Sequence, residues 1–308
     1  MDASTVDVAV WNIEADGGRN GERRDFALDI LAALKPDVVL QQEAKHSRER
    51  GGRLLHSAEK RLNLRGFLSA PNPDVDADIA TAVYLRPDMF HIAEQKPRAK
   101  PWWLHPCHVK TQLGDCPVPL NFVSFHMCFF DADQRLTEAR WLTTLAQDAT
   151  IGAGDTNSFP RCSERIALPN WATVSDRAHM VHRTYVDSQG GRHSDTRPDG
   201  ALIDAGYVDL ARHAADHLGS NGKKALDATA SFTNARQGGP QRIDRGYAAG
   251  GLEAALEHVE VIDNEDTRAA SDHALLLFRF NRGRLERLLT PGDEAARLRV
   301  GATPGNRA

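Results

Sequence analysis

Residues 149–158 read ATIGAGDTNS, and this stretch decides the fold. Its first six residues carry no charge and read as a buried strand. Asp155 and Asn157 follow directly. Because an isolated charge is costly to bury, a carboxylate in such a place is either a satisfied structural group or part of a site. The pattern predicts a strand at 149–154 that delivers polar groups at its C-terminal end.

The same pattern occurs at five other places in the chain. A carboxylate, amide or imidazole lies in or next to a strand-like apolar run at 6–13 (Asn12), 37–44 (Glu43), 120–127 (His126), 241–247 (Asp244) and 273–280 (Asp272 and His273). One such set could be structural. Six sets together indicate a shared site.

Helical periodicity separates several of these strands. Apolar residues recur at helical spacing from Phe26 to Leu34, and Pro36 ends the pattern. Residues 158–199 are rich in Pro, Gly, Ser, Arg and His, which indicates a long loop or an insertion. We also predict helices at 133–147 and 201–214, strands at 79–85 and 256–262, and a short helix followed by a frayed tail at 281–308.

Composition sets the broad class of the protein. The 308 residues are 41% hydrophobic and 26% charged, as in an ordinary globular protein with a real core. A net charge of -4 gives no global basic field, so it neither supports nor excludes a nucleic-acid substrate. The sequence shows neither a secretory signal nor a membrane span, so we expect a cytoplasmic protein with no membrane partner, and a monomer.

The six polar sets, in this order and spacing, resemble the endonuclease/exonuclease/phosphatase superfamily, which has the DNase I-like fold. The resemblance covers about residues 6–280. It implies an α/β fold, a four-layer α/β sandwich in which two face-to-face mixed β-sheets are flanked by helices, with the site at one end. The expected organisation is a catalytic domain at 1–281, containing the 158–199 loop or insertion, and a charged C-terminal tail at 282–308.

The expected cofactor is Mg²⁺ or Mn²⁺. These hard cations prefer carboxylate and amide oxygens and keep several waters. Glu43 is the leading metal ligand, with Asp272 as the second contributor and Asn12 beside them. The ion would polarise a phosphate oxygen and stabilise the leaving oxyanion.

The resemblance assigns the remaining residues to catalysis. Asp155 would orient or deprotonate the attacking water, and Asn157 and Asn12 would position that water or a phosphate oxygen. His273 would donate to the phosphate, while Asp244 accepts from its other ring nitrogen. His126 stands where DNase I-type nucleases and sphingomyelinases carry a second histidine, whereas abasic-site endonucleases carry tyrosine.

Three functions remain open at this point. The first is a hydrolase that cleaves phosphodiester bonds by direct attack of water, most simply a nuclease acting on DNA or RNA. The alternative is a phosphomonoesterase of a small organic phosphate such as a sugar, inositol or nucleotide phosphate. The third is a catalytically silent binding scaffold. Two departures from the family pattern, Thr156 between Asp155 and Asn157 and Met127 after His126, lie beside the chemistry.

Three further features have two readings each. Trp102 and Trp103 are either a stacking platform for a base or a hydrophobic anchor under a loop. The loop after Asn12, with Arg19, Arg23 and Arg24, either touches a phosphate backbone or faces water. His179, His182 and Arg183 are either a substrate-facing cluster or part of a variable surface excursion.

Overall fold

The computed structural model describes residues 4–18, 21–75, 79–162 and 165–290. Two six-stranded mixed sheets form its centre. The first sheet has the order β13-β14-β1-β2-β4-β3, and the second has the order β11-β12-β8-β7-β6-β5. Within them β1 pairs with β2 and β7 pairs with β8 in parallel, and the other pairs are antiparallel.

The strands of the first sheet are β1 (Thr5–Asn12), β2 (Val38–Gln42), β3 (Arg65–Leu68), β4 (Ala82–Leu85), β13 (Leu256–Ile262) and β14 (Leu275–Asn281). Those of the second sheet are β5 (Phe90–Lys96), β6 (Cys107–Leu113), β7 (Leu120–His126), β8 (Thr150–Asp155), β11 (Val208–Asp209) and β12 (Asp244–Ala249). A separate hairpin pairs β9 (Thr184–Val186) with β10 (Arg192–Ser194).

The α-helices are α1 (Glu14–Gly17), α2 (Arg24–Leu34), α3 (Glu49–Leu62), α4 (Ala132–Leu142), α5 (Arg177–His182), α6 (Arg197–Asp204), α7 (Leu210–His217), α8 (Glu265–Ala270) and α9 (Arg282–Leu288). Short 3₁₀ helices lie at Thr143–Leu145, Ser220–Leu226, Ala235–Gln237 and Leu252–Ala255. Among the described residues, no helix combines the length and the apolar character needed to cross a bilayer.

The core lies between the two sheets. Val8 and Leu40 of the first sheet share one buried cluster with Phe122 and Ile151 of the second. Burying a side chain of this size stabilises the fold by about 1.5–3 kcal/mol relative to leaving it exposed. Because the inward faces of both sheets are apolar, the sheets pack face to face.

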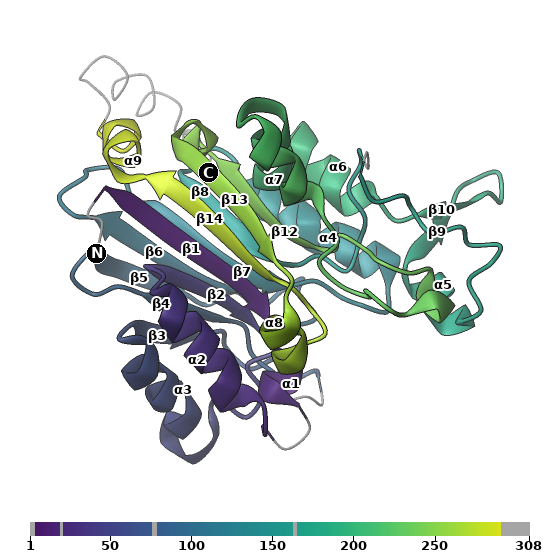
Figure 1. Ribbon diagram of the computed structural model, residues 1–308. Helices are drawn as coiled ribbons and strands as arrows, with labels where there is room; N and C mark the ends of the chain where they lie inside the picture. The colour runs from purple at the N-terminus through teal and green to yellow at the C-terminus, as the bar shows by residue number, and fades with distance from the viewer. Residues whose placement is uncertain (1–3, 19–20, 76–78, 163–164, 291–308) are drawn as a thin grey trace, which may run out of the picture.

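Helices cover the outer faces of both sheets (Figure 1). Leu28 and Leu31 of α2 pack with Trp11 on the outer face of the first sheet. Leu142 of α4 and Leu202 of α6 pack on the outer face of the second sheet. The predicted four-layer sandwich is therefore confirmed, with the order helix, sheet, sheet, helix.

Several predicted helix boundaries are wrong, each for a physical reason. The helix predicted at 133–147 ends at Leu142, and a 3₁₀ turn follows it. The helix predicted at 201–214 is two helices, because Gly206 (φ 102°) breaks the run and Val208–Asp209 pairs with β12. Asp209 then caps α7 by accepting hydrogen bonds from the amides of Ala211 and Arg212.

The sequence reading also missed elements and misplaced strand ends. It missed β3, β5, β6 and α3. Strand β5 is largely exposed at a sheet edge, so it lacks the apolar run that marks a buried strand. Strand β12 begins at Asp244 and β14 at Leu275, so Gln241 and His273 lie outside the strands predicted to hold them, and β4 begins at Ala82.

The predicted insertion and the predicted C-terminal segment both contain regular structure. Residues 158–199 contain α5 and the β9–β10 hairpin, which extend to one side in Figure 1. The predicted short C-terminal helix is present as α9, and its Leu285 is buried in the central core, as is the following Leu289. The frayed tail expected beyond it, from residue 291, lies outside the described residues.

Candidate active site

The strand directions bring the six polar sets to one end of the sandwich. Asp155 lies opposite Asp244 in the antiparallel β8–β12 pair and opposite His126 in the parallel β7–β8 pair. In the first sheet, β1 and β2 run parallel, so Asn12 and Glu43 reach the same edge. Strand β14 runs the opposite way, so the segment before it, containing His273, starts at that edge.

Gly154 lets the polar end of β8 pass close to β7. A Cβ atom on Gly154 would lie 1.8 Å from the carbonyl oxygen of Phe125, so only glycine fits there. Beyond it, Asn157 adopts a left-handed conformation (φ 49°) and its amide donates to Asp155 Oδ1 at 2.8 Å. Asn157 Nδ2 donates to the Met127 carbonyl at 2.8 Å. The loop therefore fixes the direction of the Asp155 carboxylate.

Asp155 is the central acid of the site and is 2% exposed. Its Oδ2 accepts a hydrogen bond from Asn12 Nδ2 at 3.3 Å and lies 3.6 Å from His126 Nε2 and 4.0 Å from His273 Nε2. Burial acts to raise the pKa of Asp155, but the positive charges around it, first His126 and then His273, hold that pKa below its ordinary value. Asp155 is therefore ionised at neutral pH.

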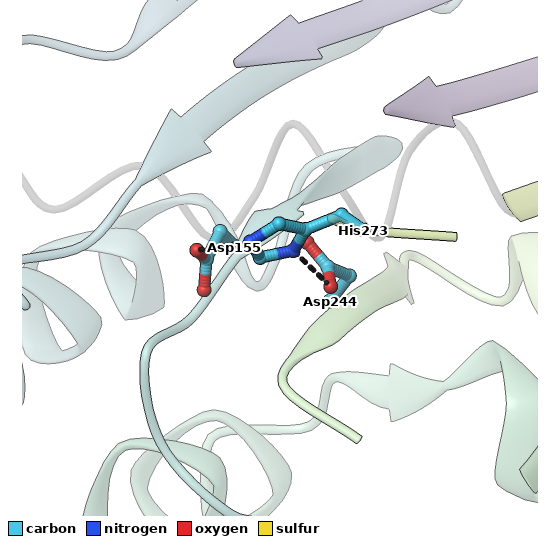
Figure 2. Close-up of side chains that lie close together, drawn as sticks. All are labelled: Asp155, Asp244 and His273. Atoms are coloured by element: carbon cyan, nitrogen blue, oxygen red, sulfur yellow. Dashed lines mark hydrogen bonds and ion pairs between the residues drawn. The ribbon is translucent and has the colours of Figure 1, made fainter. Parts of the chain in front are cut away.

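His273 is hydrogen-bonded to Asp244 through Nδ1, at 2.8 Å from Oδ2. Figure 2 shows the imidazole ring between the Asp155 and Asp244 carboxylates. Burial would lower the pKa of His273, but Asp244 first, then Asp155 and Asp272, raise it to about 10. The ring is therefore a cation at neutral pH, and its Nε2–H faces Asp155.

Two hydroxyl groups place this pair. Thr229 Oγ1 accepts a hydrogen bond from the backbone amide of Asp244 at 2.9 Å. Ser271 Oγ donates to the Asn12 carbonyl at 2.6 Å and accepts from the His273 amide at 3.2 Å, which ties the segment before β14 to the end of β1. Neither residue was among the predicted site residues, because an isolated hydroxyl carries no chemical signature in the sequence.

Glu43, Asn12 and Asp272 form the oxygen-rich side of the site. Glu43 has a positive φ of 58°, accepts from the Ala15 amide at 2.7 Å and accepts from Asn12 Nδ2 at 3.2 Å. Asn12 Oδ1 is buried and has no hydrogen-bond partner among the described residues. The carboxylate of Asp272 is 66% exposed. Desolvation and the neighbouring carboxylates, first that of Glu14 and then that of Glu43, raise the pKa of Asp272.

The observed donor set fits a hard divalent cation. It offers two carboxylates and an amide oxygen that lacks a partner, all oxygen ligands. Asp155, Asp244 and His273 lie closer together, with one ligand atom each within 4.8 Å of the others. In this second group the Nδ1 of His273 is hydrogen-bonded to Asp244, so the three side chains also form a hydrogen-bond network.

His126 bridges the two parts. Its Nδ1 lies 4.0 Å from Glu43 Oε1, and its Nε2 faces Asp155. Nδ1 is buried without a hydrogen-bond partner among the described residues. An imidazole nitrogen held this way is available to a substrate oxygen or to a water molecule.

Thr156 and Arg245 support the catalytic loop from behind. Arg245 Nη2 donates to Thr156 Oγ1 at 2.6 Å and to Ser158 Oγ at 2.7 Å, and Thr156 Oγ1 donates to the Ile243 carbonyl at 2.6 Å. All these side chains are buried. The hydroxyl of Thr156, which departs from the family pattern, thus joins the Asp155 loop to β12.

The two tryptophans, Trp102 and Trp103, lie in different environments, one in the core and one beside the site. Trp102 is 3% exposed and belongs to the core beneath α4, as a hydrophobic anchor. Trp103 is half-buried and lies 6.4 Å, ring centre to ring centre, from His126. With Phe129 at 5.2 Å and Phe130 at 5.4 Å it forms an aromatic cluster beside the site, in which the two phenylalanines are 42% and 43% exposed.

The arginines after Asn12 have structural partners. Arg24 is buried and forms an ion pair with Asp16 at 2.7 Å, and Arg23 pairs with Glu14. These two contacts do not support a role in binding a phosphate backbone. Arg19 lies outside the described residues.

The three basic residues of the insertion, His179, His182 and Arg183, also lie in different environments. His179 is buried beside Gln241, and burial lowers its pKa to about 4, so it is neutral. His182 packs against Phe129. Arg183 reaches the active site and lines a cavity shared with His273.

Solved structures with this arrangement were found at low sequence identity. An endonuclease/exonuclease/phosphatase from Bacteroides vulgatus is 13% identical with a TM-score of 0.61, over 90% of this chain and 99% of that one. A humanized TDP2 from D. rerio is 15% identical with a TM-score of 0.60, over 91% and 100%. The 3' phosphatase NExo from Neisseria is 17% identical with a TM-score of 0.57, over 90% and 99%.

No protein-family model and no curated protein sequence matches the chain. The structural likeness, by contrast, extends over about nine tenths of its length. The resemblance drawn from the six polar sets is thus confirmed in three dimensions, and the chain has the fold of the endonuclease/exonuclease/phosphatase proteins.

Proposed function

We propose that the protein is a divalent-metal-dependent phosphoesterase that hydrolyses phosphodiester bonds of a nucleic acid by direct attack of water. One observation carries this assignment. A buried, ionised carboxylate, Asp155, lies between two imidazoles, and one of these, His273, is held as a cation by Asp244. Phosphoryl transfer requires such a combination of a water-orienting acceptor and a fixed positive charge.

Each residue has a distinct task in this reaction. Asp155 Oδ2 accepts a hydrogen bond from the attacking water and takes its proton as the bond to phosphorus forms. The backbone amide of Asn157 and the side-chain Nδ2 of Asn12 both donate to the Asp155 carboxylate and so hold it in place. His273 donates from Nε2 to a non-bridging phosphate oxygen. His126 contacts the phosphate or protonates the leaving oxygen.

Glu43, Asp272 and Asn12 would hold Mg²⁺ or Mn²⁺. The ion, when bound, supplies positive charge to the phosphate and to the departing oxyanion. The buried Asn12 Oδ1 and the like charges that raise the pKa of Asp272 support this location. A cation bound there would satisfy the amide oxygen and would offset the repulsion between the carboxylates.

Two observations support a nucleic-acid substrate. The solved structures with this fold include D. rerio TDP2 complexed with single strand DNA product, Neisseria NExo bound to product DNA hairpin, and an AP endonuclease from Archaeoglobus fulgidus. In this chain, Trp103, Phe129 and Phe130 present aromatic rings next to His126. Bases of single-stranded nucleic acid stack on such rings.

The decisive experiment is a substrate screen with the purified protein. Plasmid, single-stranded DNA, RNA and a panel of phosphomonoesters are each incubated with Mg²⁺ or Mn²⁺, and the products are identified. We expect nicked or shortened nucleic acid that disappears with EDTA and with the variant Asp155→Asn. If only the phosphomonoesters react and they release inorganic phosphate, the protein is a phosphomonoesterase. If no substrate is turned over, the remaining function is that of a catalytically silent binding scaffold.

We also propose that residues 1–281 form the catalytic domain with 158–199 as a long loop or insertion, and that 282–308 form a charged C-terminal tail that begins with α9. We further propose that the protein is a monomer and that it is located in the cytoplasm. Size-exclusion chromatography with light scattering tests the first of these, and fractionation of cells that make the protein tests the second.

A further inference from the structure

A cavity of about 440 Å³ adjoins the catalytic histidine. Its lining includes His273 and Asp272 together with three polar residues, Ser231, Thr233 and Asn234. Arg183 completes the wall from the insertion, between α5 and β9. This arginine is therefore the one residue of the 158–199 segment that the described part of the chain places in this cavity.

The backbone of Arg183 is firmly held. Its amide donates to the His179 carbonyl at 2.9 Å, and its carbonyl accepts from the Asp195 amide at 3.0 Å. Asp195 in turn pairs with Arg135 at 2.9 Å, and neither of these side chains is exposed. These contacts fix the backbone of the insertion at Arg183. The position of its side chain beside the cavity therefore follows from a well-anchored segment.

The guanidinium itself lacks a partner. Nη1 of Arg183 is buried and makes no hydrogen bond within the described residues. Three buried arginines have partners within the fold, since Arg135 pairs with Asp195 at 2.9 Å, Arg242 pairs with Asp209 at 2.7 Å, and Arg245, whose Nε and Nη1 also lack hydrogen bonds, donates from Nη2 to Thr156 and Ser158. A buried donor on a charged group without an acceptor is costly, so native proteins keep one where a ligand supplies the acceptor.

The charges around Arg183 indicate the kind of ligand. Burial lowers the pKa of Arg183 to about 10, while Asp155 and Asp244 act against this change. The guanidinium therefore lies in the field of the same carboxylates that surround His273. Arg183 and His273 line the same cavity, and a guanidinium matches the oxygens of a phosphate group.

We propose that Arg183 binds a non-bridging oxygen of the substrate's scissile phosphate, opposite His273, as a second fixed cation of the active site. The ligand class is a phosphate oxyanion. The assignment rests on the proposed phosphoesterase function for its role in turnover, although phosphate binding by Arg183 can be measured without any turnover. Nearby, Arg268 also lines the cavity, but it is already paired with Asp263 at 2.6 Å.

The first test measures binding of inorganic phosphate to the metal-free protein in EDTA by calorimetry. The variants are Arg183→Gln and, as a matched control, Arg177→Gln, which changes an exposed arginine of the neighbouring helix α5. We expect Arg183→Gln to weaken binding by about 10- to 100-fold, as for loss of one charge-assisted hydrogen bond. Arg177→Gln should bind phosphate as the wild type does.

A second measurement keeps the test independent of variant folding. In wild-type protein with labelled arginine, saturating phosphate should shift the Arg183 guanidinium resonance. Free guanidinium should also restore part of the phosphate affinity to Arg183→Ala. Equal phosphate affinity of wild type and Arg183→Gln, or an unmoved Arg183 resonance in the wild type, would overturn the assignment.

These outcomes separate the two proposals. If no phosphate ester is hydrolysed but phosphate binding depends on Arg183, the phosphoesterase function fails and the Arg183 site stands. If nucleic acid is cleaved and Arg183→Gln changes neither phosphate affinity nor kcat/KM, the function stands and the Arg183 site fails.

Discussion

Replacement of Asp244 by asparagine tests the electrostatic logic of the site most directly. The pKa of His273, about 10, exceeds the ordinary histidine value of 6.5 by roughly 3.5, which corresponds to about 5 kcal/mol of preference for the protonated ring. Asp244 is the largest favourable contributor, through a 2.8 Å hydrogen bond. Because the asparagine has no charge, the pKa of His273 should fall from about 10 toward its ordinary value, while Asp155 and Asp272 still act to raise it.

The direction of the pH effect on activity depends on which protonation state of His273 takes part in the reaction. The protonated ring is the donor, so activity is present below the pKa of His273 and is lost as the pH rises through it. In the wild type this loss falls near pH 10, and in Asp244→Asn it should fall at a lower pH, shifted toward the ordinary histidine value of about 6.5. A ring that titrates near 6.5 is only about 3% protonated at pH 8, so we expect a loss of up to about 30-fold at that pH.

Two assays check this expectation. One is the pH profile of kcat/KM with saturating metal, and the other is NMR titration of the His273 ring in metal-free protein. Asp187→Asn is the matched control, because it removes the carboxylate of the exposed Asp187–His193 pair, which has a similar 2.7 Å contact. Wild-type His273 titrating near pH 6.5, or an unchanged alkaline limb in Asp244→Asn, would refute the reasoning.

Three further predictions address the metal, the backbone and the substrate. Glu43→Gln should raise the Mg²⁺ or Mn²⁺ concentration needed for half-maximal activity about tenfold or more, since it removes a charged ligand, and an unchanged metal titration would contradict that role. Gly154→Ala should lower the free energy of unfolding in urea by at least about 3 kcal/mol, since its Cβ meets a carbonyl oxygen at 1.8 Å, whereas Gly152→Ala in the same strand, with a nearest contact of 3.6 Å, should cost under about 1 kcal/mol. Phe130→Ala should raise KM for single-stranded DNA about 5- to 100-fold and leave turnover of a small diester unchanged, since it removes a stacking surface, and equal effects on both substrates would argue against stacking.

Sequence alone predicted the side chains that meet at one end of the sandwich. Asn12, Glu43, His126 and Asp155 end apolar strands, and a polar group at such a place stands out against the periodicity around it. The strands β1, β2, β7 and β8 were predicted from the strand-like apolar runs that contain or precede these residues, and in the fold they are largely buried.

Tertiary structure decided what local patterns cannot encode. Strand β5 is largely exposed at a sheet edge, so no buried apolar run marks it, and the division of the 201–214 helix depends on the pairing of Val208–Asp209 with β12. Likewise, the roles of Thr229 and Ser271 arise only from contacts across the site. Such residues have no local signature, because their partners lie far away in the sequence.

Arg183 shows the same limit within a single segment. In the sequence it stood beside His179 and His182 as one of three equal candidates, since all three are basic residues of one short stretch. In the fold, His179 is buried and neutral, His182 packs on Phe129, and Arg183 faces the cavity beside His273. The sequence determined which side chains are available, and the packing of the insertion on the sandwich decided which one lines the cavity beside His273.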